Sequence, residues 1–286
     1  MDRKKYIDVL TEQANKHGRP QEMTLSDFCD YLIEFFSIDA FKTGTAEYSQ
    51  HVLSCTKKNP DFAGLTFQWL DDVATAMERG EWLDVFGILY EEMYLSRGKA
   101  SRTGQFFTPQ SVSDLVARIS TLKAEDHGKV NDCAAGSGRL LLAHYMDKSK
   151  LDHSAGRRFE YVAQDSDPIA CKMCALNFMV HGMYGRVECR DTLLMNEPTV
   201  VYVINEVKYP FNTPYYSVRK ILEESLIISQ VHADLVRFES AQSRYKKMCK
   251  LWPQVVLRAP LVYIASYLQM TPETLSRVRA ASLQDE

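Results

Sequence analysis

The sequence predicts an α/β domain that lies between a helical N-terminal domain and a C-terminal helix-turn-helix. In the middle of the chain, short apolar runs alternate with helix-forming runs, and a tight glycine turn follows the first apolar run. Both flanking regions instead repeat apolar residues at helical spacing. We therefore expect three domains, over residues 1–100, 101–216 and 217–286.

The composition limits the classes of protein to which the chain can belong. A net charge of -3 with 25% charged residues is not that of a uniformly basic nucleic-acid-binding protein. No apolar run reaches bilayer-spanning length, and the polar start of the chain does not resemble a signal peptide. The count of seven cysteines is odd, which favours a reducing compartment over a disulfide framework. We therefore expect a cytoplasmic protein without a membrane partner.

The N-terminal region is expected to be a helical packing domain. Its helices are predicted over residues 28–36, 67–79 and 82–95. Thr24 or Ser26 can cap the first of these helices, and Gly80 is a plausible C-terminal cap of the second. We expect the aromatic stripe of the first helix to form core and not a ligand site.

The central region is expected to form a parallel sheet. A first strand leads to Asp132, and three more strands are predicted over residues 158–164, 187–190 and 200–204. One helix is expected to start at Thr108-Pro109, and another is expected to be capped by Asp167. In such a fold the ligand lies at the carboxyl ends of the strands.

Residues 130–142 contain the most informative motif, Val-Asn-Asp-Cys-Ala-Ala-Gly-Ser-Gly-Arg-Leu-Leu-Leu. Gly136 and Gly138 allow a strand to turn tightly into a helix while its backbone stays bare enough to touch a ligand. A glycine turn alone is a weak signal. The upstream motif Gly-Gln-Phe-Phe-Thr-Pro, residues 104–109, strengthens it.

These two motifs, in this order, resemble the cofactor site of adenine-N6 DNA methylases, specifically the modification subunit of type I restriction systems. Residues 85–92 and 96–99 are similar to the helix and basic linker that precede the motif in that family. The resemblance covers about residues 1–216. It implies a Rossmann-like methyltransferase domain that uses S-adenosylmethionine (SAM), acts on DNA and has a specificity subunit as a partner.

The resemblance assigns a SAM contact to each motif residue. The backbone of the turn would approach the amino-acid part of SAM, Asp132 its ammonium group, Asp165 the ribose and Asp191 the adenine amine. The remaining expected contacts are Thr108, Pro109, Ala134, Gly136 and Gly138. Each aspartate by itself can equally be a helix cap or a strand-end turn.

Arg139 stands where the family has a customary glycine. Its long cation is expected either to crowd the ligand or to extend outward to solvent.

The catalytic loop departs from the family pattern. An adenine-N6 methylase takes the target base out of the stack and holds it with an Asn/Asp-Pro-Pro-Tyr/Phe loop. Here Lys208 and Tyr209 stand where Asn and Pro belong, and a lysine cannot accept a hydrogen bond. Asn205, or the loop Tyr209-Pro210-Phe211, remains as the candidate for holding adenine. We therefore expect a degraded catalytic loop.

Cys171 and Cys174 form a C-x-x-C pair inside a predicted helix. A metal or redox site is one interpretation, although no second pair lies at zinc spacing. Two small buried core side chains are the other interpretation, and the one we favour.

Residues 259–279 are predicted to form a helix-turn-helix. Its two helices would share a core of Ile264, Leu268, Met270, Leu275 and Val278, with Thr271-Pro272 capping the second helix. The segment resembles the DNA-binding domain of Crp/Fnr-type transcription regulators. That resemblance implies a recognition helix over residues 272–280 and a homodimer through a long helix over residues 221–238.

The implied DNA contacts are Glu273, Thr274, Ser276 and Arg277. An excess of basic residues between positions 236 and 280 favours this interpretation. The alternative is a helical hairpin with a solvated basic face.

Two hypotheses for function remain at this point. One is a DNA-associated adenine-N6 methylase-like enzyme with a degraded catalytic loop. The other is a non-enzymatic DNA-binding regulator whose α/β domain is a sensor or a remnant. A loop 205–211 that is folded over an open pocket above Gly136 would favour the enzyme, and a collapsed loop would favour the regulator.

Overall fold

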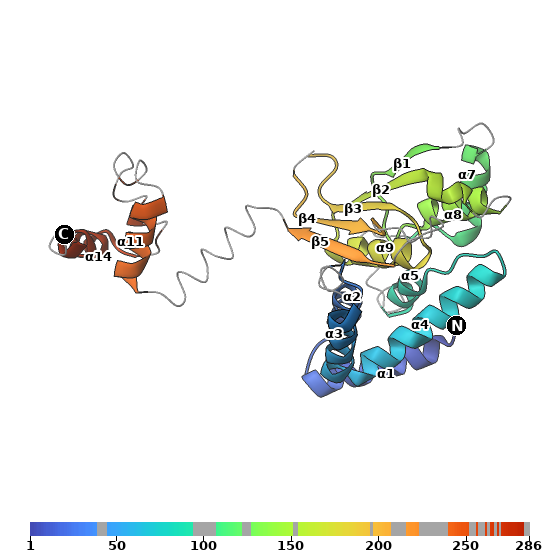
Figure 1. The fold of residues 1–286 in the computed structure, drawn as a ribbon, viewed down its shortest axis with the longest axis horizontal. Coiled ribbons are helices and arrows are strands. Elements are labelled where there is room, and N and C mark those ends of the chain that lie inside the picture. The colour runs from blue at the N-terminus through green and yellow to red at the C-terminus, as the bar shows by residue number, and fades with distance from the viewer. Residues whose placement is uncertain are drawn as a thin grey trace. The chain divides into compact units, whose positions relative to one another are not determined.

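The computed structural model describes residues 1–38, 45–93, 107–121, 127–150, 154–194, 197–206, 216–222, 240–251, 256, 261, 264–265, 268 and 270–282. The chain divides into two compact units, Met1–Leu222 and Glu223–Glu286 (Figure 1). The N-terminal helices and the sheet lie in the same unit and share one hydrophobic core. The second unit thus begins at Glu223, a few residues after the expected boundary at residue 217.

The N-terminal region is helical, as predicted. Its helices are α1 (Arg3–His17), α2 (Gln21–Phe35), α3 (Thr45–Lys58), α4 (Pro60–Glu78) and α5 (Val85–Tyr90). The predicted caps Thr24 and Ser26 are wrong, because α2 begins at Gln21 after Pro20 and both residues lie inside the helix. Gly80 has a left-handed φ of 72° just after α4, so the predicted end of that helix is confirmed.

The aromatic side chains of these helices form core. The Phe28 and Phe86 ring centroids lie 6.1 Å apart, those of Trp69 and Phe86 lie 5.2 Å apart, and all three residues are fully buried. Burying aromatic rings of this size is a large part of what holds α2, α4 and α5 together. The expectation that the stripe is core is confirmed.

The sheet has five strands in the order β1-β2-β3-β4-β5. They are β1 (Gly128–Asp132), β2 (Phe159–Asp165), β3 (Gly185–Cys189), β4 (Val200–Ile204) and β5 (Val218–Leu222). The first three run parallel, but β4 is antiparallel to β3, and β5 is antiparallel to β4. The expected all-parallel sheet is therefore wrong, and Ile221, expected in a long helix, lies in β5.

The length of the connection explains why β4 is reversed. A parallel strand needs a crossover of about a dozen residues or more, usually through a helix. Only residues 190–199 separate β3 from β4. The chain therefore turns back, and the carboxyl end of β4 lies at the opposite end of the sheet from the carboxyl ends of β1, β2 and β3.

Helices cover one face of the sheet. Helix α8 (Arg139–Ser149) follows β1 and α9 (Pro168–Val180) follows β2, and right-handed crossovers in one direction place both on the same face. Ala163, Val187 and Tyr202 are in register on that face and are buried. The other face is polar, with Arg186 paired to Glu160 at 3.1 Å and to Glu188 at 2.7 Å. This alternation is typical of a sheet with one packed and one solvated face.

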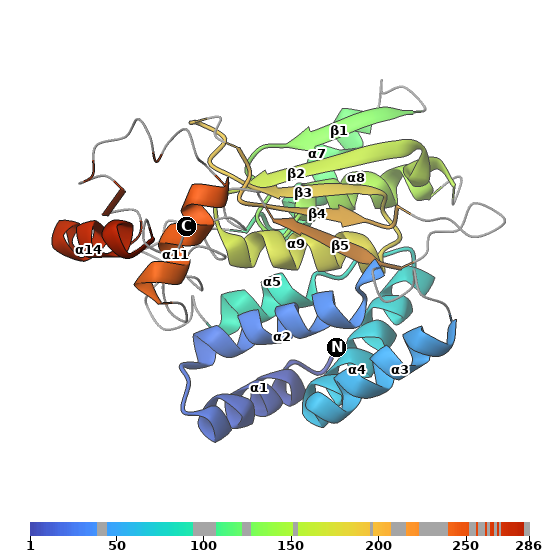
Figure 2. The same cartoon turned by 60° about the vertical axis from the view of Figure 1, so that its left-hand side comes forward.

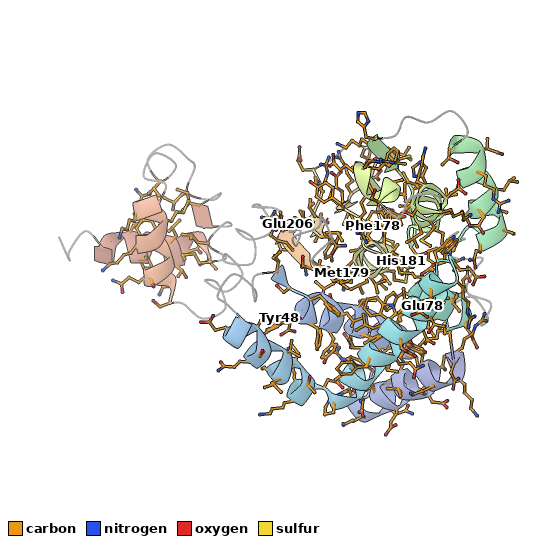
Figure 3. All side chains as sticks on the ribbon, turned by 45° about the vertical axis from the view of Figure 1, so that its right-hand side comes forward. Tyr48, Glu78, Phe178, Met179, His181 and Glu206 are labelled. Carbon is orange, nitrogen blue, oxygen red and sulfur yellow. The ribbon has the colours of Figure 1, made fainter. Side chains whose placement is uncertain are left out.

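Helix α9 is the central packing element of the first unit. It contacts β2, β3 and β4 on one side and α2 on the other, and Figure 3 shows its Phe178 and Met179 in the interior with His181 just beyond them. Figure 2 shows the N-terminal helices on the far side of α9 from the strands. Asp167 accepts a hydrogen bond from the Ile169 amide at 3.0 Å, so the predicted cap of this helix is confirmed.

The second unit contains α11 (Ala241–Leu251) and α14 (Pro272–Ser282). Its core is Tyr245, Met248, Ile264, Ala265, Leu268 and Leu275, with Met270 and Val278 packed against it. The five residues expected to share a core therefore lie in one cluster. The Thr274 amide donates to Thr271 Oγ1 at 3.2 Å, which confirms the predicted helix start. Residues 223–238 lie outside the described residues.

Within the part of the chain that the structure describes, no helix is both long and apolar enough to cross a membrane.

The buried His181 predicts a loss of stability in mild acid. Its Nδ1 lies 2.7 Å from the Asn177 carbonyl, and its Nε2 accepts from the Leu83 amide at 3.3 Å, so the neutral ring satisfies both contacts. Burial lowers the pKa of His181 to about 4. Because the unfolded chain takes up a proton near pH 6.5 and the folded chain does not, the free energy of unfolding should fall by about 3 kcal/mol between pH 6.5 and pH 4.

Chemical denaturation across this pH range measures the effect, with His181→Gln as the comparison. Burial also lowers the pKa of His144, which contributes in the same direction in both proteins, so the difference between the curves isolates His181. The variant should show a clearly shallower pH dependence. Parallel curves would contradict the assignment.

Candidate functional site

The loops after β1 and β2 are hydrogen-bonded to one another at the carboxyl ends of these strands. The Ala135 amide donates to the Gln164 carbonyl at 3.0 Å, and the Gly136 amide donates to Asp165 Oδ2 at 2.8 Å. The other carboxylate oxygen of Asp165 accepts from the Asp167 amide at 2.9 Å. Asp165 thus fixes the glycine turn from the neighbouring strand.

The loop after β3 joins the same end. The Arg190 amide donates to the Asp165 carbonyl at 2.8 Å, and Thr192 Oγ1 donates to the Cys133 carbonyl at 3.1 Å. Asp191 lies between them, and its Oδ1 accepts from the amides of the next turn. The structure therefore brings Asp132, Asp165 and Asp191 to one end of the sheet, as expected from the sequence.

The two glycines of the turn have left-handed φ values of 55° at Gly136 and 88° at Gly138. A Cβ atom on Gly138 would lie 2.8 Å from Cys174 Sγ, and one on Gly136 would lie 3.0 Å from the Phe107 ring. Glycine is thus required at both positions, because the φ values are left-handed and because neighbouring side chains leave no room for a Cβ atom.

Asp132 has one satisfied and one unsatisfied carboxylate oxygen. Its Oδ1 accepts from the Ala134 amide at 3.0 Å, but its Oδ2 is buried and has no hydrogen-bond partner among the described residues. Burial raises the pKa of Asp132, and the nearby charge of Asp165 raises it further. A buried acceptor without a partner is costly, and a cationic donor is the partner that would satisfy it best.

Asp84 is the buried anchor of the turn. Its side chain is 1% exposed and accepts four hydrogen bonds. The Gly87 amide and Asn177 Nδ2 donate to Oδ1, each at 2.8 Å. Ser137 Oγ at 2.6 Å and Arg139 Nε at 2.7 Å donate to Oδ2. One carboxylate therefore connects α5, the glycine turn, α8 and α9.

Arg139 does not extend outward to solvent, so that expectation is wrong, while the expectation that it crowds the ligand stays a prediction. Its side chain is 8% exposed, and besides Asp84 it pairs with Glu91 at 2.8 Å and donates to the Thr108 carbonyl at 3.3 Å. The guanidinium carbon lies 5.3 Å from the centre of the Phe107 ring. Burial alone would lower the pKa of Arg139, but Asp84 and Glu91 outweigh it and raise the pKa above its ordinary value.

These contacts bring the upstream motif to the glycine turn. Phe107 packs on Gly136 and meets Tyr90 edge-on, with ring centroids 5.3 Å apart. Helix α7 (Gln110–Thr121) begins directly after Pro109, whose carbonyl accepts from the Val112 amide at 3.0 Å. Thr108 and Pro109 thus lie next to the turn and just before the helix, which begins one residue later than predicted. Residues 104–106 lie outside the described residues.

Asn205 lies at the other end of the sheet. It follows β4, next to the start of β3, and is fully buried with a φ of 52°. Its Nδ2 donates to the carbonyls of Met179 at 3.0 Å and Met183 at 2.8 Å, and its Oδ1 accepts from the Ser217 amide at 3.0 Å. The amide is fully engaged within the protein. The structure therefore does not bring Asn205 to the glycine turn, because β4 is reversed.

The remainder of the expected catalytic loop, Lys208, Tyr209, Pro210 and Phe211, lies outside the described residues. Glu206, labelled in Figure 3, is the last described residue before it. It pairs with Arg219 of β5.

Both cysteines of the C-x-x-C pair are fully buried. A contact with Cys189, and then burial, raise the pKa of Cys171, and burial raises the pKa of Cys174. Among the described residues no group of histidine, cysteine and acidic side chains is arranged to hold a metal ion. The interpretation of Cys171 and Cys174 as core side chains is confirmed.

The residues expected to contact DNA lie on α14. Glu273, Ser276 and Arg277 are exposed, Thr274 is half-buried, and Leu275 points into the core of the second unit. The exposed side chains therefore share the solvent side of one helix.

Sequence reasoning missed Asp84 and Glu91. The signal was present, because an arginine inside a buried turn requires a carboxylate partner. Asp84 stands directly before the apolar run that begins at Val85, where a helix cap is expected, and its side chain caps α5 through the Gly87 amide.

Asn205→Ala should destabilise the protein without changing the glycine turn. The substitution leaves the Ser217 amide and the Met179 and Met183 carbonyls without their buried partner, which costs about 2–4 kcal/mol of unfolding free energy. Denaturant unfolding measures this loss. The Ala135 and Gly136 amides of the glycine turn should exchange hydrogen as in the wild type at a temperature where both proteins are folded. Faster exchange at the turn with unchanged stability would contradict this placement.

Comparison with known proteins identifies a family. Residues 82–241 match the model of the N-6 DNA methylase family. The methylase subunit of type I restriction enzyme MpnII from Mycoplasma pneumoniae is 35% identical over 104 residues, which are 35% of this chain and 18% of that protein. The MjaIX methylase subunit from Methanocaldococcus jannaschii is 26% identical over 143 residues, which are 48% of this chain and 25% of that protein. The chain thus spans a quarter or less of the length of these relatives.

A solved structure is also similar, the type I restriction-modification methyltransferase subunit from Streptococcus thermophilus. It is 22% identical, with a TM-score of 0.33, and the match covers 68% of this chain and 40% of that one. The family match includes the whole of the glycine turn and extends from Trp82, next to Asp84, past the last strand of the sheet. Since it covers more than half of the 286 residues, the chain belongs to the N-6 DNA methylase family.

Proposed function

We propose that this chain binds SAM at the turn between β1 and α8, as the cofactor-binding part of a DNA adenine-N6 methylase of the type I kind. The observation that carries the proposal is Asp132, whose buried Oδ2 has no hydrogen-bond partner among the described residues. The ammonium group of SAM is a cationic donor of the kind that this oxygen lacks. SAM supplies an electrophilic methyl group on its sulfonium.

The charges around the turn favour a cation. Asp132, Asp165 and Asp191 lie at the same end of the sheet, while the cation of Arg139 is paired with Asp84 and Glu91. The sulfonium and ammonium groups of SAM would therefore approach a locally negative surface.

The residues expected to contact SAM could still make the hydrogen bonds that the proposal assigns to them. Both carboxylate oxygens of Asp165 already accept an amide, but each has a second lone pair for a ribose hydroxyl. Asp191 holds its own turn through Oδ1 and would accept from the adenine amine. Thr108 and Pro109 would cover the amino-acid end, and the backbone at Ala134, Gly136 and Gly138 would line it.

We further propose that the target-base loop is degraded, so that this chain alone does not methylate adenine. Asn205, the expected acceptor for the exocyclic amine, already makes three hydrogen bonds at the other end of the sheet. Transfer requires the base to be held within reach of the methyl group. A specificity subunit is the partner that would complete a DNA-bound assembly.

Isothermal titration of the purified chain with SAM tests the cofactor proposal. We expect micromolar affinity, weakened at least tenfold by Asp132→Ala because the ammonium loses its carboxylate. Asp147→Ala is the matched control, since it removes a half-buried carboxylate on the last turns of α8 and should leave affinity unchanged. No binding by the wild type, or an equal loss in both variants, would refute the site.

A second activity, DNA binding by the second unit, has a separate observation behind it. Glu273, Ser276 and Arg277 are exposed on α14, whose Leu275 is buried in a small independent core. This is the arrangement that a recognition helix needs, with apolar residues anchoring it and polar residues facing outward. It would serve either a methylase subunit or a DNA-binding regulator.

Fluorescence anisotropy with duplex DNA tests the activity of the second unit. Arg277→Ala should weaken binding about tenfold, by loss of a guanine or phosphate contact. Arg79→Ala, which removes the same charge from an exposed site in the first unit, is the control and should change little. Equal affinities for both variants would show that α14 does not contact DNA.

A further inference from the structure

A polar cavity opens between the N-terminal helices, away from the glycine turn. It has a volume of about 350 Å³ and is lined by residues of α1, of α2, of the turn between them and of the start of α4. These helices lie on the far side of α9 from the strands (Figure 2). The volume is within the range of small-molecule sites, roughly 300–1,000 Å³, and exceeds what one buried water needs.

Thr24 contributes an unsatisfied hydroxyl to this cavity. The residue is 3% exposed, and its Oγ1 is buried without a hydrogen-bond partner among the described residues. A helical threonine can satisfy its hydroxyl on the carbonyl four residues earlier, as Thr66 does by donating to the Phe62 carbonyl at 2.8 Å. Because a buried hydroxyl without a partner is costly, Thr24 indicates that a group in the cavity hydrogen-bonds to it.

Two side-chain amides that line the cavity have N–H groups to spare. Gln13 Nε2 donates to Asp61 Oδ2 at 2.6 Å, and Asn59 Nδ2 donates to Gln13 Oε1 at 3.2 Å. Asn59 Oδ1 accepts from the Phe62 amide at 3.0 Å. Each amide nitrogen carries two hydrogens, so Gln13 and Asn59 each keep one donor, whereas both amide oxygens already accept. The cavity therefore offers donors to an oxygen atom of a ligand.

The charges at the cavity favour an uncharged ligand. Arg19 pairs with Asp27 at 2.8 Å, and these side chains are 51% and 38% exposed, so the ion pair lies at the rim. His17, the other basic residue at the cavity, is also exposed. Gln13 and Thr24, its most buried polar residues, carry no charge. A buried ion would lack a free counter-ion here, and burying one costs far more than burying a hydrogen-bonded amide.

We propose that this cavity binds a small uncharged molecule in which a carbonyl lies next to an N–H group, as in an amide or a lactam ring. The carbonyl oxygen accepts from the free N–H groups of Gln13 and Asn59, and the N–H of the ligand donates to Thr24 Oγ1. The Phe62 side chain gives the ligand an apolar wall. The cavity shares no residue with the glycine turn, so the inference does not depend on the proposed binding of SAM.

Saturation-transfer NMR on the full chain with uracil, a lactam with two carbonyl groups, tests the proposal. The wild type should bind uracil with a dissociation constant of about 1 mM or tighter, as expected for a ligand of this size with a few hydrogen bonds. Thr24→Val keeps the shape of the side chain and removes its hydroxyl, so affinity should fall about fivefold. The free energy of unfolding should not fall, because the hydroxyl that is removed has no partner in the protein.

Thr56→Val is the matched control. Thr56 Oγ1 donates to the Val52 carbonyl at 2.9 Å, and the residue does not line the cavity, so affinity should be unchanged. No saturation transfer to uracil at about 10 mM would overturn the proposal, because water alone would then fill the cavity. Equal affinities of the two variants, or tighter binding of acetate than of uracil, would overturn it as well. So would displacement of uracil by SAM, which would place uracil at the glycine turn.

Discussion

The first unit depends on the buried carboxylate of Asp84. This group accepts hydrogen bonds from the first turn of α5, from Ser137 in the glycine turn, from Arg139 and from α9. Because a buried charge is costly without a partner, Asp84 and Arg139 each require the other. A Cβ on Gly87 would lie 2.0 Å from Asp84 Oδ2. Only glycine therefore leaves room in α5 for the Asp84 carboxylate. The helical region and the end of the sheet with the glycine turn therefore form one structure.

The direction of β4 decides which residues lie near the glycine turn. Three strands deliver their loops to one end, where Asp132, Asp165 and Asp191 meet around a bare turn. Because the connection after β3 is short, β4 runs in the reverse direction and Asn205 lies at the other end of the sheet. There its side chain hydrogen-bonds to the backbone of the protein. The described residues thus bring together the three aspartates proposed to bind SAM, and Asn205, the group expected to hold the base, lies away from them.

Local patterns predicted the parts of the fold that depend on neighbouring residues. The sequence predicted the ends of β1 and β2, the cap at Asp167 and the glycine turn. Each of these features depends on a few adjacent side chains. Strand direction was not, since periodicity marks a strand without giving its direction. The caps at Thr24 and Ser26 failed because Pro20 starts α2 earlier. The pairing of Asp84 with Arg139 joins residues far apart in the chain, which spacing cannot indicate.

A double-mutant cycle between Asp84 and Arg139 tests the role of this anchor most directly. The free energy of unfolding would be measured for the wild type, Asp84→Ala, Arg139→Ala and the double variant. If the two charges depend on one another, each single variant should lose about 3–5 kcal/mol and the double variant little more, giving a coupling energy of at least about 2 kcal/mol. Additive losses, with a coupling energy below about 0.5 kcal/mol, would contradict the account.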